Sequence, residues 1–323
     1  MPVAPRPPTT TYLDFEQPLA ALDADIARAL AAGNRERLRR LRRERRRAEA
    51  AVLARLTPWE QVQLSRHPDR PAMLDYVRAL CAEFVELHGD RRFGDDGAVV
   101  GGLARLRGRA VVVVGHQRGH GTADQVARNF GMPRPEGYRK AVRLFELAER
   151  FRRPVITLVD TQGAYPGIDA EQRGQAEAIA TCIRTLVALR VPVVSAIIGE
   201  GGSGGALALG VGDRIVMQEH AWFSVLSPEG CASILFRERT PAAVARSAAL
   251  LRLTASDLRA FGVIDEVVRE PAGGAHRDPT RAARLLGRAL EQQLSTLSRS
   301  TPRSLVARRY ARYRQLGSHL SPV

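Results

Sequence analysis

The sequence is poor in cysteine, lysine and long apolar runs, and each shortage excludes a class of protein. Its three cysteines, Cys81, Cys182 and Cys231, lie far apart and fit neither a disulfide framework nor a zinc knuckle. We therefore expect reduced thiols and no metal site in this chain. No apolar run approaches the roughly 18 residues of a membrane span, and the N-terminus has no signal-peptide pattern. These absences predict a cytoplasmic protein that does not contact a membrane.

Lysine occurs only once, at Lys140, whereas arginine is abundant and the formal net charge is +15. Such a charge invites a nucleic-acid-binding interpretation. The near absence of lysine indicates a compositional bias towards arginine, so the charge carries less functional meaning. Much of it lies near the two ends, in residues 35–49 and 303–314. An acidic partner or a solvated helix face accounts for these segments better than DNA does.

The N-terminal part of the chain reads as helical. Leucines recur at helical spacing on both sides of "AAGN" (31–34), which predicts a helical hairpin. A further helix is predicted over about 71–88, with Pro71 at its start and Gly89 at its end. The predicted organisation is a disordered tail, the hairpin, a main domain and a basic C-terminal tail, over residues 1–10, 11–56, 57–300 and 301–323.

The middle of the chain alternates between apolar strands and helices. Residues 98–119 predict a β-hairpin around the turn "RGR". Three units follow, each with a strand, a glycine-bearing turn and a helix, and their strands are expected over 154–160, 191–198 and 214–226. Continuous apolar strands that alternate with helices are typical of an α/β fold with a covered parallel sheet.

The loop "IIGEGGSGGALALG" (197–210) matches more than one functional pattern. Gly199, Gly201 and Gly204 spell the G-x-G-x-x-G of a dinucleotide-binding turn, and Glu219 lies near the spacing expected of the acidic partner. The helix after the loop is very short for this motif. No lysine follows the glycines, which argues against a Walker-type phosphate loop.

A second pattern in the loop is the G-x-S-x-G of a hydrolase, formed by Gly201, Ser203 and Gly205. In this alternative Ser203 is the nucleophile of a thioester or ester hydrolase and needs a downstream acid and histidine. Two pairs stand in that order, namely Asp265 with His276 and Asp213 with His220.

A third interpretation needs no side chain at all. Gly204 and Gly205 would lie at a helix N-terminus, where backbone N–H groups are free and the helix dipole favours negative charge. Without Cβ atoms, they let a ligand oxygen approach the backbone. The turn "TQGAYPG" repeats this arrangement one unit earlier, with a second candidate pair of donors at Gly163 and Ala164.

A series of motifs in this order closely resembles the α subunit of bacterial acetyl-CoA carboxylase carboxyltransferase, from about residue 11 to 315. The motifs are "GHQRG", "RNFGMPRPEGYRKA", "DTQGAYPG", "AEQRGQAEAIA", "IGEGGSGGALALGVGD", "SPEGCASIL" and "EPAGGAHRDP". The resemblance implies a crotonase-like fold, a spiral of β-β-α units. It also implies transfer of a carboxyl group from carboxybiotin to acetyl-CoA, which gives malonyl-CoA for fatty acid synthesis.

The resemblance further implies partners and site residues. Biotin arrives on a biotin carboxyl carrier protein, a zinc-containing β subunit completes an α₂β₂ heterotetramer, and biotin carboxylase belongs to the larger complex. Gly204 and Gly205 are expected to hold the biotin oxyanion through their N–H groups. The expected substrate-binding residues around them are Gly201, Gly202, Ser203, Gly163, Ala164 and Tyr165.

Two positions depart from the family pattern. The family usually has proline where this chain has Gln162, and often lysine where it has Arg118. Proline would stiffen the turn by fixing φ, so Gln162 leaves the turn more freedom. Arg118 keeps the positive charge but presents it as a planar fork.

Overall fold

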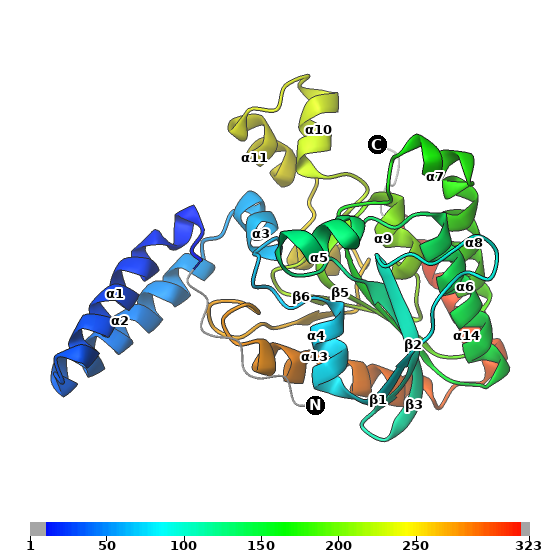
Figure 1. Ribbon diagram of the computed structural model, residues 1–323, viewed down its shortest axis with the longest axis horizontal. Coiled ribbons are helices and arrows are strands. Elements are labelled where there is room, and N and C mark those ends of the chain that lie inside the picture. Colours follow the sequence, from blue (N-terminus) through cyan, green and yellow to red (C-terminus); the bar gives the residue numbers. More distant parts are fainter. Residues whose placement is uncertain (1–10, 318–323) are drawn as a thin grey trace.

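The computed structural model describes residues 11–317, so the predicted disordered tail and the last six residues of the predicted C-terminal tail lie outside the described part. A twisted sheet lies between two layers of helices (Figure 1). The strands are β1 Cys81–Glu86, β2 Val99–Leu106, β3 Arg109–His116, β4 Val155–Thr161, β5 Val193–Gly202, β6 Arg214–Gln218, β7 Trp222–Ser224 and β8 Glu266–Val268.

The helices cover both faces of this sheet and also form two projections, α1–α2 and α10–α11 (Figure 1). They are α1 Gln17–Ala31, α2 Arg35–Leu53, α3 Pro58–Ser65, α4 Met73–Leu80, α5 Gly121–Ala127, α6 Pro135–Arg150, α7 Ile168–Gln172, α8 Gln175–Ala188, α9 Ser203–Gly210, α10 Pro228–Leu235, α11 Pro241–Leu250, α12 Ala255–Ala260, α13 Pro279–Leu297 and α14 Pro302–Gln315, with short 3₁₀ turns η1 Asp14–Glu16 and η2 Asn129–Gly131. Among the helices of residues 11–317, none is both long enough and apolar enough to cross a membrane.

The sheet follows the order β1-β2-β3-β4-β5-β6-β8, and β7 pairs with the end of β5. Strands β1 to β3 are antiparallel, as the predicted hairpin requires, whereas the pairs from β3 onward are parallel. Every residue of β4 and β5 is buried. The continuous apolar runs of these strands therefore reflect a sheet that is covered on both faces.

The core is divided by the sheet into two halves. Successive side chains of a strand point to opposite faces, and β5 shows this directly: Ile197 packs with Leu144 of α6, whereas Ile198 packs with Leu286 of α13. Helices α6, α8 and α9 cover the first face, and α4 and α13 cover the second. Because β4 and β5 are fixed on both faces, the turns that follow them start from a rigid base.

The helix predicted over 71–88 is wrong in its second half. Helix α4 ends at Leu80, and the chain continues directly into the edge strand β1. Strand β1 pairs with β2 across a bulge at Glu83, which has φ +56°. A Cβ atom on Gly102 of β2 would lie only 2.0 Å from the Val85 carbonyl oxygen, so this pairing needs glycine. A tertiary contact thus overrides the local helical pattern.

The strand predicted over 214–226 is two strands. The chain leaves β6 at Gln218 and returns to the sheet as β7, which pairs with β5 at Gly201 opposite Phe223. A Cβ atom on Gly201 would lie 2.7 Å from the Phe223 ring, so this close pairing also requires glycine. Pairing with β7 extends β5 beyond its predicted end into the glycine loop.

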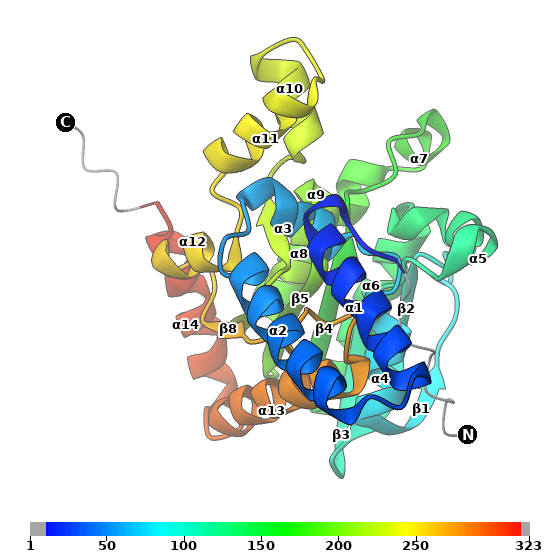
Figure 2. The same cartoon turned by 90° about the vertical axis from the view of Figure 1, so that its left-hand side faces the viewer.

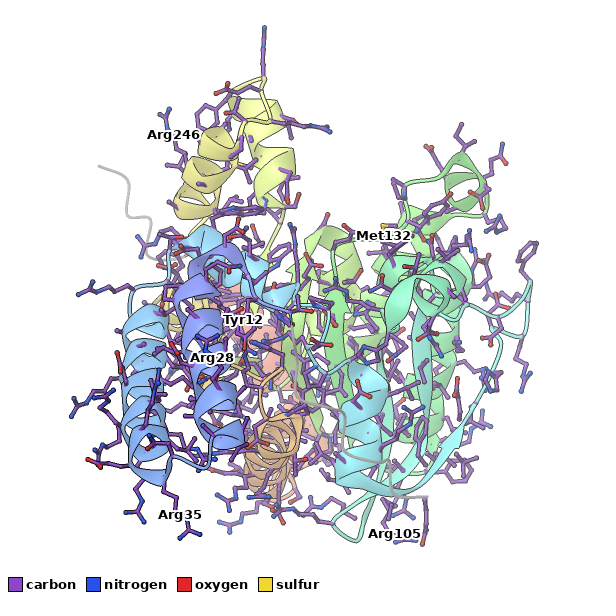
Figure 3. All side chains as sticks on the ribbon, turned by 60° about the vertical axis from the view of Figure 1, so that its left-hand side comes forward. Tyr12, Arg28, Arg35, Arg105, Met132 and Arg246 are labelled. Atoms are coloured by element: carbon purple, nitrogen blue, oxygen red, sulfur yellow. The ribbon has the colours of Figure 1, made fainter. Side chains whose placement is uncertain are left out.

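The N-terminal helical hairpin is confirmed. Helices α1 and α2 run side by side and project from the main body (Figures 1 and 2). Asn34 caps α2 by accepting a hydrogen bond of 3.0 Å from the Arg37 amide. Leu19 and Leu41 are buried, whereas most of the arginines of α2 point to solvent, as Figure 3 shows for Arg35.

The predicted basic C-terminal segment contains helix α14, which packs on the main body. Its Arg309 is only 1% exposed and pairs with Asp213 at 2.7 Å. The same guanidinium donates hydrogen bonds to carbonyls at the end of α8 and before β5, those of Leu186, Leu189 and Val191. The interpretation of this charge as a solvated face is therefore wrong for Arg309, because the guanidinium is a buried cap for backbone carbonyls.

Candidate functional site

In the structure, the glycine loop of residues 197–210 is a direct junction of a strand and a helix. Strand β5 ends at Gly202, and α9 begins at Ser203. Gly204 and Gly205 are the second and third residues of α9, so their amides have no carbonyl one turn earlier to bond to. Within residues 11–317, neither amide donates a hydrogen bond to a loop or side-chain acceptor. Ser203 is exposed, Gly204 half-buried and Gly205 buried, so the mouth of the helix opens to solvent on the Ser203 side.

The turn after β4 lies directly against this loop. A Cβ atom on Gly205 would lie 2.4 Å from the Ala164 amide nitrogen and 2.5 Å from the Gly163 carbonyl carbon. A Cβ atom on Gly202 would lie 2.0 Å from the Gln162 carbonyl oxygen. These two glycines are therefore required by backbone-to-backbone packing, and the loop and the turn form one unit.

The turn itself is held by Thr161. The buried Thr161 hydroxyl donates to the Gly163 carbonyl at 2.8 Å and accepts the Gly163 amide at 3.1 Å. The Tyr165 amide donates to the Pro133 carbonyl at 3.0 Å. The predicted second pair of donors is therefore wrong, because the Gly163 amide is already bonded. Thr161 also supplies stiffness that a proline at position 162 would otherwise give.

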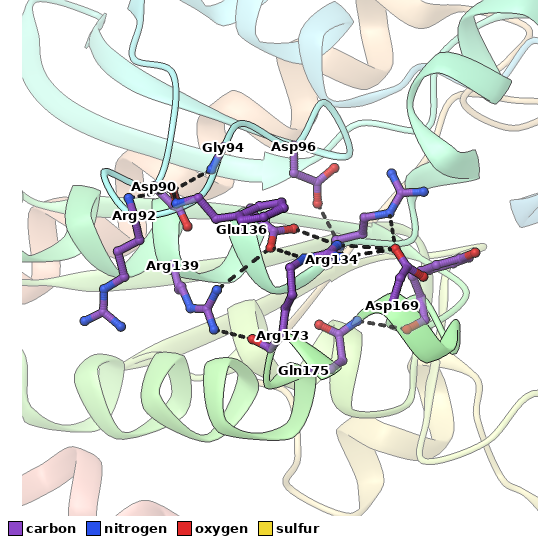
Figure 4. Close-up of polar contacts among 12 residues, drawn as sticks. Asp90, Arg92, Gly94, Asp96, Arg134, Glu136, Arg139, Asp169, Arg173 and Gln175 are labelled. Carbon is purple, nitrogen blue, oxygen red and sulfur yellow. Dashed lines mark hydrogen bonds and ion pairs between the residues drawn. The ribbon is translucent and has the colours of Figure 1, made fainter. Parts of the chain in front are cut away.

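Tyr165 forms a wall beside the turn and is held by the N-terminal ends of α6 and α8. The Arg134 guanidinium lies 4.9 Å from the centre of its ring, a cation–π contact. The Gln175 amide group donates to the Tyr165 carbonyl at 2.9 Å. Arg134 also approaches Asp169 of α7, which pairs with Arg173 (Figure 4). This polar network fixes the segment between β4 and α8.

Four charged side chains meet beneath the glycine loop. The Arg118 guanidinium lies 3.0 Å from a Glu200 oxygen and 3.5 Å from an Asp160 oxygen, and Arg66 donates to Glu200 at 2.6 Å. Asp160 accepts the Glu200 amide at 2.9 Å. Burial raises the pKa of Asp160, although Arg118 opposes this shift. Both carboxylates are almost fully buried, so their charges depend on the two arginines.

A cavity of about 200 Å³ opens next to this cluster. Sequence reasoning did not single out Arg66 or Glu200 for this site. The glutamate within a glycine-rich buried strand was a visible signal, but nothing in the sequence linked it to Arg66. The residues that line the cavity are Arg66, Arg118, Gln125, Phe130, Gln162 and Glu200.

The dinucleotide interpretation of the loop is wrong. Gly199 and Gly201 lie within β5 and not in a turn, so they do not form the phosphate-binding bend. A Cβ atom on Gly199 would lie 2.3 Å from the Asp160 carboxylate, so this glycine makes room for a buried acid. The Glu219 carboxylate accepts the Glu270 amide at 3.1 Å and is engaged in the fold.

The hydrolase interpretation finds no catalytic arrangement around Ser203. In the described part of the chain, the Ser203 hydroxyl makes no hydrogen bond to a histidine or a carboxylate. Asp265 pairs with two arginines, and Asp213 pairs with an arginine of α14. His276 lies in a separate cluster, and the amide of His220 is bonded to Glu270. A nucleophile without a base or an orienting acid is not activated.

A buried cluster of Glu16, His67 and His276 joins the hairpin to the main body. Their ligand-type atoms lie within 4.8 Å of one another. The two imidazoles are stacked, with centres 3.9 Å apart and planes at 21°. Their lone pairs lie in two nearly parallel planes and so do not converge on one point between the rings, which does not suit a metal ion. Arg277 pairs with Glu16 at 3.0 Å, and the cluster acts as a structural anchor.

The fold and the site together define the class of protein. The transcarboxylase 12S core has the same fold at 22% identity and a TM-score of 0.55, over 70% of this chain and 42% of that chain. The β subunit of P. aeruginosa geranyl-CoA carboxylase matches at 20% identity and a TM-score of 0.54, over 77% and 46%. The chain is thus an α/β protein with the crotonase-like carboxyltransferase fold.

Sequence comparison then identifies the family. Residues 12–317 match the model "Acetyl co-enzyme A carboxylase carboxyltransferase-like". The acetyl-coenzyme A carboxylase carboxyl transferase subunit alpha of Stenotrophomonas maltophilia is 53% identical, over 95% of this chain and 98% of that protein. The corresponding protein of Aromatoleum aromaticum is 51% identical, over 95% and 97%. The chain belongs to the acetyl-CoA carboxylase carboxyltransferase family.

Proposed function

We propose that this chain is the α subunit of an acetyl-CoA carboxylase carboxyltransferase. It would transfer a carboxyl group from carboxybiotin on a biotin carboxyl carrier protein to acetyl-CoA, which gives malonyl-CoA for fatty acid biosynthesis. The observation that carries the proposal is the pair of amides at Gly204 and Gly205, which have no acceptor in the described chain. The relatives that are named as alpha subunits, at 51 to 53% identity, support it.

Carboxybiotin supplies an activated carboxyl group, whose departure leaves negative charge on the ureido oxygen. The Gly204 and Gly205 amides hold that charge, and the dipole of α9 adds to the effect. The residues fit this role because the position of Gly204 is free of a side chain and the helix mouth is open beside Ser203. Preorganised donors cost no reorganisation during the reaction, and losing one typically costs about 10²–10³-fold in rate.

The charge cluster beneath the loop supports the same role. Arg66 and Arg118 carry two positive charges, and Asp160 and Glu200 carry two negative charges when ionised. Because Arg66 also pairs with Glu229, the two arginines are fully matched by carboxylates, and the cluster fixes the end of β5 without adding positive charge to the site. The partial positive charge at the start of α9 is then the feature that attracts an anion.

We further propose a β subunit that completes the site in an α₂β₂ heterotetramer. The acetyl-CoA enolate needs its own pair of donors, and the Gly163 amide is already bonded to Thr161. Zinc is expected in that β subunit. Exposed apolar side chains on the projecting α10–α11 and on α7 offer a surface for it, namely Ile234, Leu235, Leu250 and Ile168. Biotin carboxylase as a further partner and a cytoplasmic location stay predictions from the sequence.

The proposed role of Gly204 is tested by a substitution that removes its backbone N–H group and keeps helix α9. Gly204→Pro deletes the N–H in the first turn of α9, where proline is tolerated. Gly204→Ala is the matched control, because its Cβ atom would make only an ordinary contact of 3.8 Å with Ile179. The assay mixes the chain with a β subunit, biocytin and malonyl-CoA, and follows formation of acetyl-CoA.

We expect Gly204→Pro to lower kcat by about 10²–10³-fold and Gly204→Ala to stay within a few fold of the unmodified chain. Thermal unfolding and binding of the β subunit check that both variants are folded. Equal rates for the two variants would show that the Gly204 amide does not hold charge. No activity of the unmodified chain with any cognate β subunit would overturn the proposed function itself.

A further inference from the structure

A large cavity of about 1050 Å³ lies at the amino ends of the parallel strands. Its walls are the turn of the β2–β3 hairpin, the segments that lead into β4 and β5, and the link between α13 and α14. Figure 3 shows Arg105 at the bottom of the view, whereas Met132 lies in its upper half. Strand β5 has ten residues, which separates the cavity from the glycine loop by about 30 Å.

The lining of the cavity is strongly basic. Its one carboxylate, Glu149, is occupied by Arg190, which donates to it from the backbone at 2.9 Å and from the side chain at 3.1 Å. The lining arginines are Arg105, Arg109, Arg152, Arg153 and Arg190. Arg190 and Glu149 neutralise each other, and the other lining arginines leave the cavity with an excess of positive charge.

Two of these arginines, Arg152 and Arg153, are exposed, and their guanidinium groups have no polar partner in residues 11–317. Their backbone is nevertheless held firmly. Helix α6 ends just before them, Arg152 has φ +52°, and the Arg153 amide donates to the Ala148 carbonyl at 2.8 Å. This helix ending fixes where the two side chains emerge. Their guanidinium groups remain available to a ligand at a defined place.

We propose that this cavity binds a di- or triphosphate group. The planar guanidinium fork matches phosphate oxygens in a bidentate way, and several forks around one space suit a ligand with several phosphates. Ser298 and Ser300 also line the cavity. The same chemistry occurs in inorganic polyphosphate and in nucleotides. The apolar lining from Pro154, Pro192 and Leu305 leaves room for the base and sugar of a nucleotide.

Calorimetric titration of the full chain with ADP and with pyrophosphate, at low and moderate salt, tests the site. We expect binding that weakens as salt rises and an affinity for ADP that falls at least tenfold in Arg153→Ala. Arg153→Lys keeps the charge and should recover part of the affinity. Arg43→Ala is the matched control, because it removes the same charge from exposed α2 and should change the affinity by less than twofold.

The two probes distinguish the sources of the phosphate group. Tighter binding of ADP than of pyrophosphate assigns the cavity to nucleotides, whereas equal binding assigns it to inorganic polyphosphate, and either result supports the site. Equal losses in Arg153→Ala and Arg43→Ala would reduce the effect to general attraction by a basic protein and overturn the proposal. Absence of binding by both probes at low salt would also overturn it.

Discussion

Helix ends at the two ends of the parallel strands differ in whether their free backbone groups are hydrogen-bonded. At the carboxyl edge, α9 starts directly after β5, and the amides of Gly204 and Gly205 have no partner in the described chain. At the amino edge, α8 ends, and its last carbonyls accept hydrogen bonds from Arg309. One helix end is filled by the protein itself, and the other has free amides that we propose bind an anion.

Two arginines at the amino ends of the strands, Arg309 and Arg153, show the same contrast between a group bonded within the protein and a group that is not. Arg309 is buried, pairs with Asp213 and replaces water at backbone carbonyls, so it is part of the fold. Arg153 lies at the same edge, but its side chain is exposed and its guanidinium pairs with no other described residue. The comparison teaches that burial and partners, not residue type, decide whether a charged or polar group stabilises the protein or recognises a ligand.

The largest effect, on both activity and stability, is expected from a side chain at Gly205 in the first turn of α9. In Gly205→Val the new side chain would collide with the backbone of Gly163 and Ala164, so the loop and the turn must separate. We expect no measurable carboxyl transfer and a loss of about 3 kcal/mol in the free energy of unfolding. Urea unfolding and the biocytin assay measure both. A Gly205→Val protein as stable as Gly204→Ala would show that the two turns are not packed together.

The next effect, on stability alone, is expected from opening the filled helix end. Arg309→Ala leaves Asp213 buried without its partner and exposes the carbonyls of α8. Breaking a buried pair in this way costs about 3–5 kcal/mol of unfolding free energy. Arg314→Ala, an exposed arginine on the same helix, is the control and should stay within about 0.5 kcal/mol. Similar losses in the two variants would contradict the role given to Arg309.

A smaller effect is expected where the hairpin meets the main body, at the stacked rings of His67 and His276. Burial lowers the pKa of His67 to about 4, and burial lowers that of His276 as well. Burial alone would raise the pKa of Glu16, but the nearby His276 ring and the hydrogen bonds from the Leu13 amide and Arg277 outweigh it and hold the pKa at about 2.

The sign of the pH effect follows from these shifts. An unfolded histidine has a pKa of about 6.5, so the stabilisation is complete above that pH and is lost as the pH falls through about 4. His67→Asn keeps an acceptor for the Asp69 amide but cannot titrate. Urea unfolding at pH 7 and pH 4 should show that His67→Asn loses about 2 kcal/mol less than the unmodified chain. Equal losses would mean that His67 is not neutral when folded.

The smallest effect is expected from Ser203→Ala. Ser203 is exposed at the mouth of α9, and its hydroxyl is not bonded to a histidine or an acid among the described residues. The carboxyl-transfer rate should therefore stay within about twofold, because the donors at this helix end are backbone amides. A loss of about 10³-fold or more would return Ser203 to the role of nucleophile.

Much of the fold could be predicted because its signals are local. The helical hairpin, the strand hairpin and the three strand–turn–helix units follow from apolar periodicity and glycine positions. The exceptions depend on contacts across the sheet. Strand β1 forms because it pairs with β2 at Gly102, and β7 forms because it pairs with β5 at Gly201. No local pattern encodes such pairings.

The candidate site also has a part that the sequence predicted and a part that it did not. Its glycines could be found from the sequence, and the motif resemblance supplied their proposed role. The cluster beneath them could not, since Arg66 lies 134 residues before Glu200 in the chain. The anchor of Glu16 and His276 joins residues that lie still further apart along the chain. Long-range pairs of charges arise only when distant segments have packed together.

The sequence by itself determined where the backbone could come close to a ligand, because glycine at 204 and 205 leaves no side chain in the way. It also offered Gly163 as an equivalent donor. Only the tertiary structure decided between them. The Thr161 hydroxyl takes the Gly163 amide, whereas the start of α9 leaves its own amides without acceptors. A backbone donor becomes a binding group only when the folded chain gives it nothing else to bond, and that depends on every segment packed around it.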